Sequence, residues 1–191
     1  MKAFRDGASP KLAAEIRAFV KQEINHTREH IVFNKAAAEA GYDMDKIDVR
    51  LEENMRLIRE RPQIVNLAAT IALEHYTAIM AHEFLANPRH FKNAEPETAA
   101  MWRWHAIEEI EHKAVAYDTY LHATRDMMPL RRWLKRCAVM GITTLRFHYV
   151  IFRNTADLLR QDGRNDWTTW RHLLAYLYGR HGLMRHLLKG V

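Results

Sequence analysis

Apolar residues recur at three- and four-residue steps along most of the 191-residue chain, a spacing that places them on one face of an α-helix. Prolines and glycines interrupt this pattern where helices begin or end. The sequence therefore predicts an all-α fold in a single domain of residues 1–191, in which residues 10–125 are distinguished from a C-terminal part of residues 129–188. The expected helices span residues 10–39, 43–61, 62–86, 96–123, 129–159 and 167–188.

The apolar face of the first expected helix also carries ionisable side chains. Its stripe contains Ile16, Phe19, Val20, Glu23, His26, Thr27, His30 and Phe33. The third helix repeats the feature, because Glu74 is the only charged residue in line with Ile64, Leu67, Ile71, Ala78 and Ala81. A buried carboxylate without a partner costs several kcal/mol or is forced to take up a proton, so these positions predict a bound cation or another compensating partner.

The fourth expected helix has the densest group of such residues. His105, Glu109 and His112 lie at positions i, i+4 and i+7 and therefore share one face. Glu108 lies beside this face, whereas Glu111 is displaced from it and is expected to be solvated.

Two Glu-x-x-His pairs result, Glu23 with His26 and Glu109 with His112. This spacing brings a carboxylate and an imidazole to the same metal ion from a single helix turn. We therefore expect one two-metal site in which the two carboxylates lie within about 10 Å of each other. The expected ligands are Glu23, His26, Glu74, His105, Glu109 and His112, with His30 and Thr77 as hydrogen-bonding partners of the ligands and Glu108 as the proton acceptor.

The residue types in the chain limit which metals it can bind and indicate the cellular compartment in which it is found. Cys137 is the only cysteine, which excludes an intramolecular disulfide and a cysteine cage and favours a reducing, cytoplasmic location. Imidazole prefers transition metals, so iron is the expected ion, with manganese or zinc as alternatives. The N-terminal residues lack the apolar stretch of a secretory signal, and no nearly uncharged segment approaches the roughly 20 residues that span a bilayer.

Positive charge is concentrated in the C-terminal third. Residues 1–124 contain 16 Lys and Arg against 19 Asp and Glu, while residues 125–191 contain 13 against 4. No nucleic-acid-binding signature accompanies this excess, so nucleic acid is not an expected partner. Trp133, Trp167 and Trp170 lie among these basic helices, which leaves peripheral membrane contact as an alternative to packing within the protein.

The pattern resembles ferritin-like helical bundles that bind two metal ions, and more closely the family of predicted metal-dependent hydrolases. The resemblance rests on segments 19–30, 73–78 and 104–113. Family members generally begin with an earlier helix that carries a Gly-Glu pair, and this chain begins after that point. The resemblance thus implies a bundle lacking one helix, with one ion if the site is incomplete and with Ile16, Val20 and Ile71 exposed. A homodimer that covers this surface is expected.

Three functions fit these residues. The first is a hydrolase that acts on an unidentified small molecule through a dinuclear His/carboxylate site. The second is a non-haem di-iron oxidase or oxygenase. His105 favours this function because it resembles the extra histidine of the arylamine N-oxygenases among di-iron proteins. The third is a degenerate helical protein that binds a partner without catalysis.

Overall fold

The computed structural model describes residues 1–180 and 182–184, and these residues contain helices and no strands, which confirms the predicted all-α class. The helices are α1 (Pro10–Glu39), α2 (Asp45–Arg59), α3 (Gln63–Ala86), α4 (Pro96–Ala123), α5 (Pro129–Gln161) and α6 (Trp167–Tyr178). Two short 3₁₀ helices, η1 (Lys2–Phe4) and η2 (Pro88–Phe91), precede α1 and α4.

Local signals in the sequence explain where the helices begin and end. Ser9 accepts a hydrogen bond from the backbone N–H of Leu12, and Pro10 occupies the first position of α1. Gly41 follows α1 with a φ of +100°, a conformation that favours glycine. The first five helices start and stop within two residues of the predicted bounds. The sixth, expected to reach residue 188, ends at Tyr178 with Gly179 as its C-cap, and residues 185–188 lie outside the described residues.

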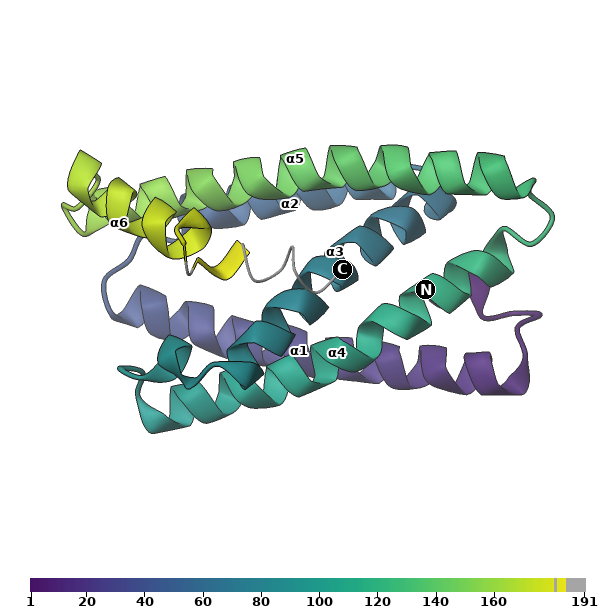
Figure 1. Ribbon diagram of the computed structural model, residues 1–191, viewed down its shortest axis with the longest axis horizontal. Coiled ribbons are helices and arrows are strands. Elements are labelled where there is room, and N and C mark those ends of the chain that lie inside the picture. The colour runs from purple at the N-terminus through teal and green to yellow at the C-terminus, as the bar shows by residue number, and fades with distance from the viewer. Residues whose placement is uncertain (181, 185–191) are drawn as a thin grey trace.

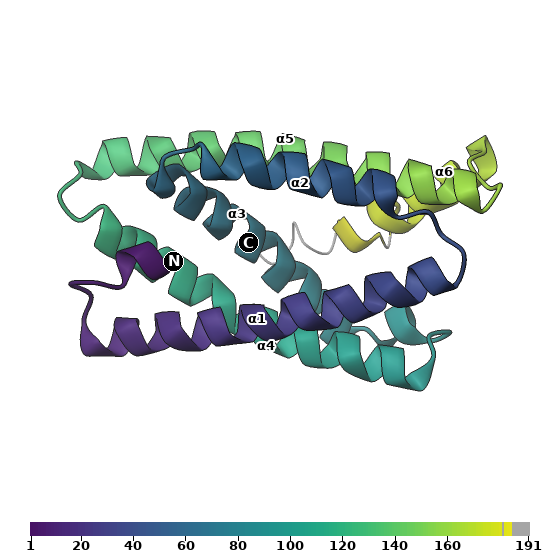
Figure 2. The same ribbon diagram turned by 180° about the vertical axis from the view of Figure 1, so that it is seen from behind.

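The long helix α3 occupies the centre of the fold and packs against α4 and α5, while α1 packs against α4 (Figure 1). Seen from behind, α2 and α5 run side by side along the edge opposite α1 (Figure 2). A salt bridge of 2.7 Å between Arg50 and Asp157 joins α2 to α5. The core between α3 and α4 contains Leu67, Ala68 and Tyr120, each no more than 2% exposed. This arrangement brings the inner faces of α1, α3 and α4 together.

The predicted buried stripe of α1 is correct only as far as His26. Ile16, Phe19 and His26 are buried, but the stripe residues beyond them are exposed, including Phe33 at 44%. The helix contacts α4 along one side, and no other long helix packs extensively on the second half of α1. Helical periodicity identifies a face, but only the neighbouring helices decide how much of that face is covered.

The expected exposure of Ile16 is wrong, since this residue is 1% exposed. Val20 and Ile71 are half-buried rather than open to water. The N-terminal turn η1 folds against both α1 and α4 and adds cover at this end of the bundle. The largest exposed apolar side chains lie elsewhere, for example Ile31 on α1 at 63% and Leu145 on α5 at 75%.

Among the described residues, α3 is the one helix long and apolar enough to pass a composition test for a membrane span. The core helices of other proteins pass the same test. Here α3 packs against two other helices and carries two buried carboxylates, Glu74 and Glu83, as a helix inside a protein fold can when those groups have partners.

Candidate metal centre

Four of the predicted ligands meet at the contact between α1 and α4. Glu23, His26, Glu109 and His112 each offer one ligand atom, and these atoms all lie within 4.8 Å of one another. The carboxylates of Glu23 and Glu109 are therefore well inside the roughly 10 Å limit expected for a shared site. The inward Glu-x-x-His pairs of two separate helices thus face each other.

The remaining two predicted ligands lie beside this cluster. Glu74 reaches it from α3, with its Oε2 atom 3.5 Å from Nδ1 of His112. His105 reaches it from the preceding turn of α4, with its Nε2 atom 3.3 Å from Oε1 of Glu109. The structure thereby brings all six predicted residues to one place.

The cluster is buried on most sides. His26, Glu109 and His112 are between 1% and 7% exposed, and Glu74 is 9% exposed. Glu23 differs, because 40% of its side chain is exposed. The group therefore lies inside the helix bundle and meets solvent at Glu23.

The two buried histidines, His26 and His112, both direct Nδ1 toward the cluster, because Nε2 of each contacts a residue beside it. Nε2 of His26 lies 2.8 Å from Oε2 of Glu108, and since an ionised carboxylate only accepts hydrogen bonds, Nε2 is the donor. Nε2 of His112 lies 3.3 Å from Oε1 of Gln22, and the amide oxygen is likewise an acceptor. Both imidazoles are thus held from outside, which leaves Nδ1 of each directed inward.

Those inward atoms lie near carboxylate oxygens, at 3.0 Å for His112 and 3.6 Å for His26, but form no hydrogen bond of acceptable geometry. Nδ1 of His26, Nδ1 of His112 and Oε2 of Glu74 are buried side-chain atoms without a hydrogen bond of acceptable geometry. Buried polar atoms in folded proteins are nearly always paired, so three such atoms in one place call for a missing partner. Nitrogen and carboxylate oxygen atoms together form a donor set that suits a divalent transition metal.

Glu109 directs its two oxygen atoms to different imidazoles. Oε1 lies 3.5 Å from Nδ1 of His26, and Oε2 lies 3.9 Å from Nδ1 of His112. Glu23 also approaches both rings, at 3.6 Å from His26 and 3.0 Å from His112. Each carboxylate therefore lies between the two histidines.

Charge within the cluster is balanced between acids and bases. Burial disfavours the charged forms of Glu23 and His112, but their mutual attraction outweighs it, lowering the pKa of Glu23 to about 2 and raising the pKa of His112 to about 10. Burial lowers the pKa of His26, but the contacts of this imidazole with the carboxylates of Glu23 and Glu108 outweigh that effect, so the pKa is raised as well. The protonated forms that the carboxylates favour on these imidazoles supply positive charge to the metal-free cluster, and binding of a metal ion would displace their protons.

Two neighbours have shifts in the opposite sense. Burial, together with electrostatic repulsion from His26, lowers the pKa of His105 to about 4 and keeps this imidazole neutral at pH 7. Burial and the nearby carboxylate of Glu109 raise the pKa of Glu74. A neutral imidazole is the form that binds metal.

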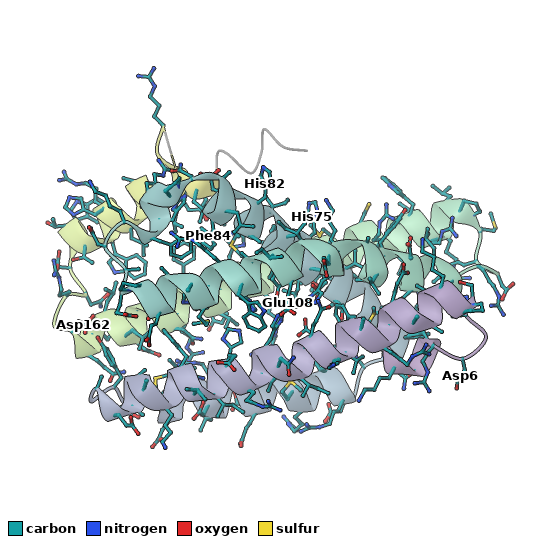
Figure 3. All side chains as sticks on the ribbon, turned by 90° about the horizontal axis from the view of Figure 1, so that it is seen from below. Asp6, His75, His82, Phe84, Glu108 and Asp162 are labelled. Carbon is teal, nitrogen blue, oxygen red and sulfur yellow. The ribbon has the colours of Figure 1, made fainter. Side chains whose placement is uncertain are left out.

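The residues predicted to support the ligands have varied contacts. The His30 ring lies 5.2 Å from that of His105, and the Thr77 hydroxyl donates to the backbone carbonyl of Glu74 rather than to its carboxylate. Glu108 lies on the α1 side of α4 (Figure 3) and contacts His26. Glu111 is exposed as predicted.

Gln22 is a functional candidate that the sequence reasoning missed. Its amide oxygen contacts His112, while its amide nitrogen donates to Oε2 of Glu111 over 3.2 Å. Gln22 therefore links an exposed carboxylate to a buried imidazole. Its position directly before Glu23, three residues after Phe19, is the one sequence signal that could have indicated this contact.

Comparison with models of known protein families identifies the family of this chain. The family model described as "Predicted metal-dependent hydrolase" matches residues 1–191. No curated protein and no solved structure gives a significant match to the chain.

Proposed function

The chain belongs to the predicted metal-dependent hydrolase family, and on this premise we propose that it is a hydrolase with a dinuclear His/carboxylate site in a ferritin-like bundle. The observation that carries the proposal is the convergence of the buried Nδ1 atoms of His26 and His112 with a buried oxygen of Glu74, none of which forms a hydrogen bond of acceptable geometry. The proposed ligands are Glu23, His26, Glu74, His105, Glu109 and His112. The mixed donor set favours iron, followed by manganese and zinc.

The residues of this chain have separate tasks in the proposed site. Bound metal supplies Lewis-acid chemistry that activates water for attack on an electrophilic centre. His26 and His112 present Nδ1 atoms whose direction is fixed by Glu108 and Gln22. Burial of His26, Glu109 and His112 limits the access of bulk water, and half-exposed Glu23 marks the side that a substrate would reach.

Glu108 has a different role in this proposal from the one expected from sequence. Its Oε2 atom holds the ring of His26 at 2.8 Å, so this carboxylate is better placed to orient a ligand than to remove a proton from water. A carboxylate, a histidine and a metal in series are a common arrangement in metal sites, where the carboxylate fixes the tautomer and the ring orientation.

The role of Glu108 can be tested by substitution. Glu108→Ala is expected to weaken metal affinity about 10–100-fold, because His26 loses the group that orients it. Glu108→Gln retains an oxygen acceptor and should restore most of that affinity. Affinities are measured by competition with a coloured chelator, and equal losses in both variants would contradict an orienting role.

The proposed function is tested by metal reconstitution followed by assays of hydrolysis. The purified chain is loaded anaerobically with Fe(II), Mn(II) or Zn(II), and metal content is measured after desalting. We expect about two equivalents per chain, with hydrolysis of model esters, amides or phosphoesters in the loaded form and none in a His112→Ala variant. A chain that retains none of the three metals would refute the proposal.

The alternative function is a di-iron oxidase or oxygenase. Three imidazoles, those of His26, His105 and His112, lie in or beside the cluster, and this nitrogen content also suits iron that reacts with O₂. Exposure of the ferrous protein to air separates the two functions. Stoichiometric O₂ consumption without hydrolysis of the model substrates would favour the oxidase.

A further inference from the structure

A cavity lies between α3, α4 and α5, and none of the six proposed metal ligands lines it. Its volume is about 630 Å³, within the usual range for small-molecule sites. The apolar part of its wall is formed by Ala68, Ile71, Ala72 and Met140. Helix α1, which supplies two of the proposed ligands, contributes nothing to it. His75, which lines the cavity, lies on the opposite side of α4 from Glu108 in Figure 3.

The charged residues of this cavity are all basic. Lys113 from α4 and Arg136 from α5 line it together with His75, and none of the lining residues is acidic. Neither Lys113 nor Arg136 forms a salt bridge within residues 1–180 and 182–184. The guanidinium of Arg136 lies over the ring of Tyr117, 5.0 Å from its centre, which fixes this charge at the cavity wall.

The apolar wall and the basic residues together indicate which class of ligand fits the cavity. An apolar wall stabilises a hydrocarbon body, while two unpaired cations beside that wall favour one anionic group. Arginine presents a planar fork of donors that matches a carboxylate. We propose that this cavity binds a small amphipathic carboxylate, with its carboxylate at Lys113 and Arg136 and its alkyl or aryl body along α3. The site is independent of the proposed metal chemistry.

Two residues of the cavity allow a direct test in the full-length protein. Cys137 lines the cavity and is the only cysteine in the chain, so its alkylation by iodoacetamide reports on occupancy. Gly141 also lines the cavity, and a Cβ atom added there meets no atom within 4 Å. Gly141→Leu therefore adds a bulky side chain at the cavity wall, where its Cβ meets no neighbouring atom, and replaces a poor helix-forming residue with a good one. Ala138→Leu, on the same helix but outside the lining, is the matched control.

The probes are decanoate, decanol and decyltrimethylammonium, each below its micellar concentration. Decanoate is expected to slow alkylation of Cys137 in the natural chain and in Ala138→Leu, but not in Gly141→Leu. Calorimetry should show decanoate binding about tenfold more tightly than decanol, with the cationic probe weakest. The double variant Lys113→Gln, Arg136→Gln should abolish the preference for decanoate and leave decanol binding unchanged.

Three outcomes would overturn the proposal. Equal affinities for all three probes would remove the role of charge. Binding of decanoate that survives Gly141→Leu would place the ligand elsewhere. No binding of decanoate by the natural chain, whose fold is verified by circular dichroism, would exclude this class of ligand.

Discussion

Replacing Glu109 with alanine is expected to abolish metal uptake. The affinity for metal should fall by more than about 100-fold, because the variant loses a proposed ligand and the carboxylate that compensates the histidines. Glu109 is 7% exposed and is the one proposed ligand whose two oxygens face different imidazoles. Its loss would therefore affect both metal positions of the proposed dinuclear site. Elemental analysis of the reconstituted, desalted protein measures the effect.

Glu111→Ala provides the control for this substitution. Glu111 lies two residues further along the same helix, is exposed, and reaches the cluster only through Gln22. Its removal should change metal affinity by no more than a few-fold, because an exposed hydrogen bond contributes little. Equal metal loss in the two variants would mean that the ligand face of α4 has been assigned incorrectly.

Removal of bound metal with a chelator is expected to lower the melting temperature substantially. A ligand present at about 1,000 times its dissociation constant stabilises the folded state by about 4 kcal/mol, which corresponds to roughly 8–16 °C in a chain of this size. The physical reason is that the metal pairs with buried atoms of His26, His112 and Glu74 that lack hydrogen bonds.

Differential scanning calorimetry of the loaded and chelated forms measures this shift. The Glu109→Ala variant should melt at the same temperature with and without chelator, since it has no metal to lose. Glu111→Ala should retain the full shift. A natural chain that takes up metal but melts at one temperature in both forms would show that the ion binds outside the buried cluster.

The helices could be predicted from sequence because their boundaries depend on local interactions. Ser9 and Pro10 start α1, and Gly41 follows its end with a positive φ. The inward positions of Glu74, Glu109 and His112 could also be predicted, since a charged residue in a row of apolar residues shares their face. These are consequences of helical periodicity alone.

Other features depend on contacts between helices and could not be predicted in this way. Whether His26 turns Nδ1 or Nε2 inward is decided by Glu108 on another helix, 82 residues away in sequence. The contact of Gln22 with His112 likewise depends on how α1 crosses α4. The same packing leaves Phe33 exposed although it continues the apolar stripe of α1. Periodicity defines the face of a helix, and tertiary packing defines what that face contacts.

Because the cluster is buried unevenly, different residues of the proposed site are expected to control the rate of metal exchange and the affinity for metal. His26, Glu109 and His112 are almost completely enclosed, whereas 40% of the Glu23 side chain is open to solvent. An ion that arrives or leaves on that side passes one carboxylate whose rotamer can change without disturbing the packed helices. In the proposed site, the enclosed residues would therefore determine how tightly the ion is held, and the movement of Glu23 would determine how quickly it is exchanged.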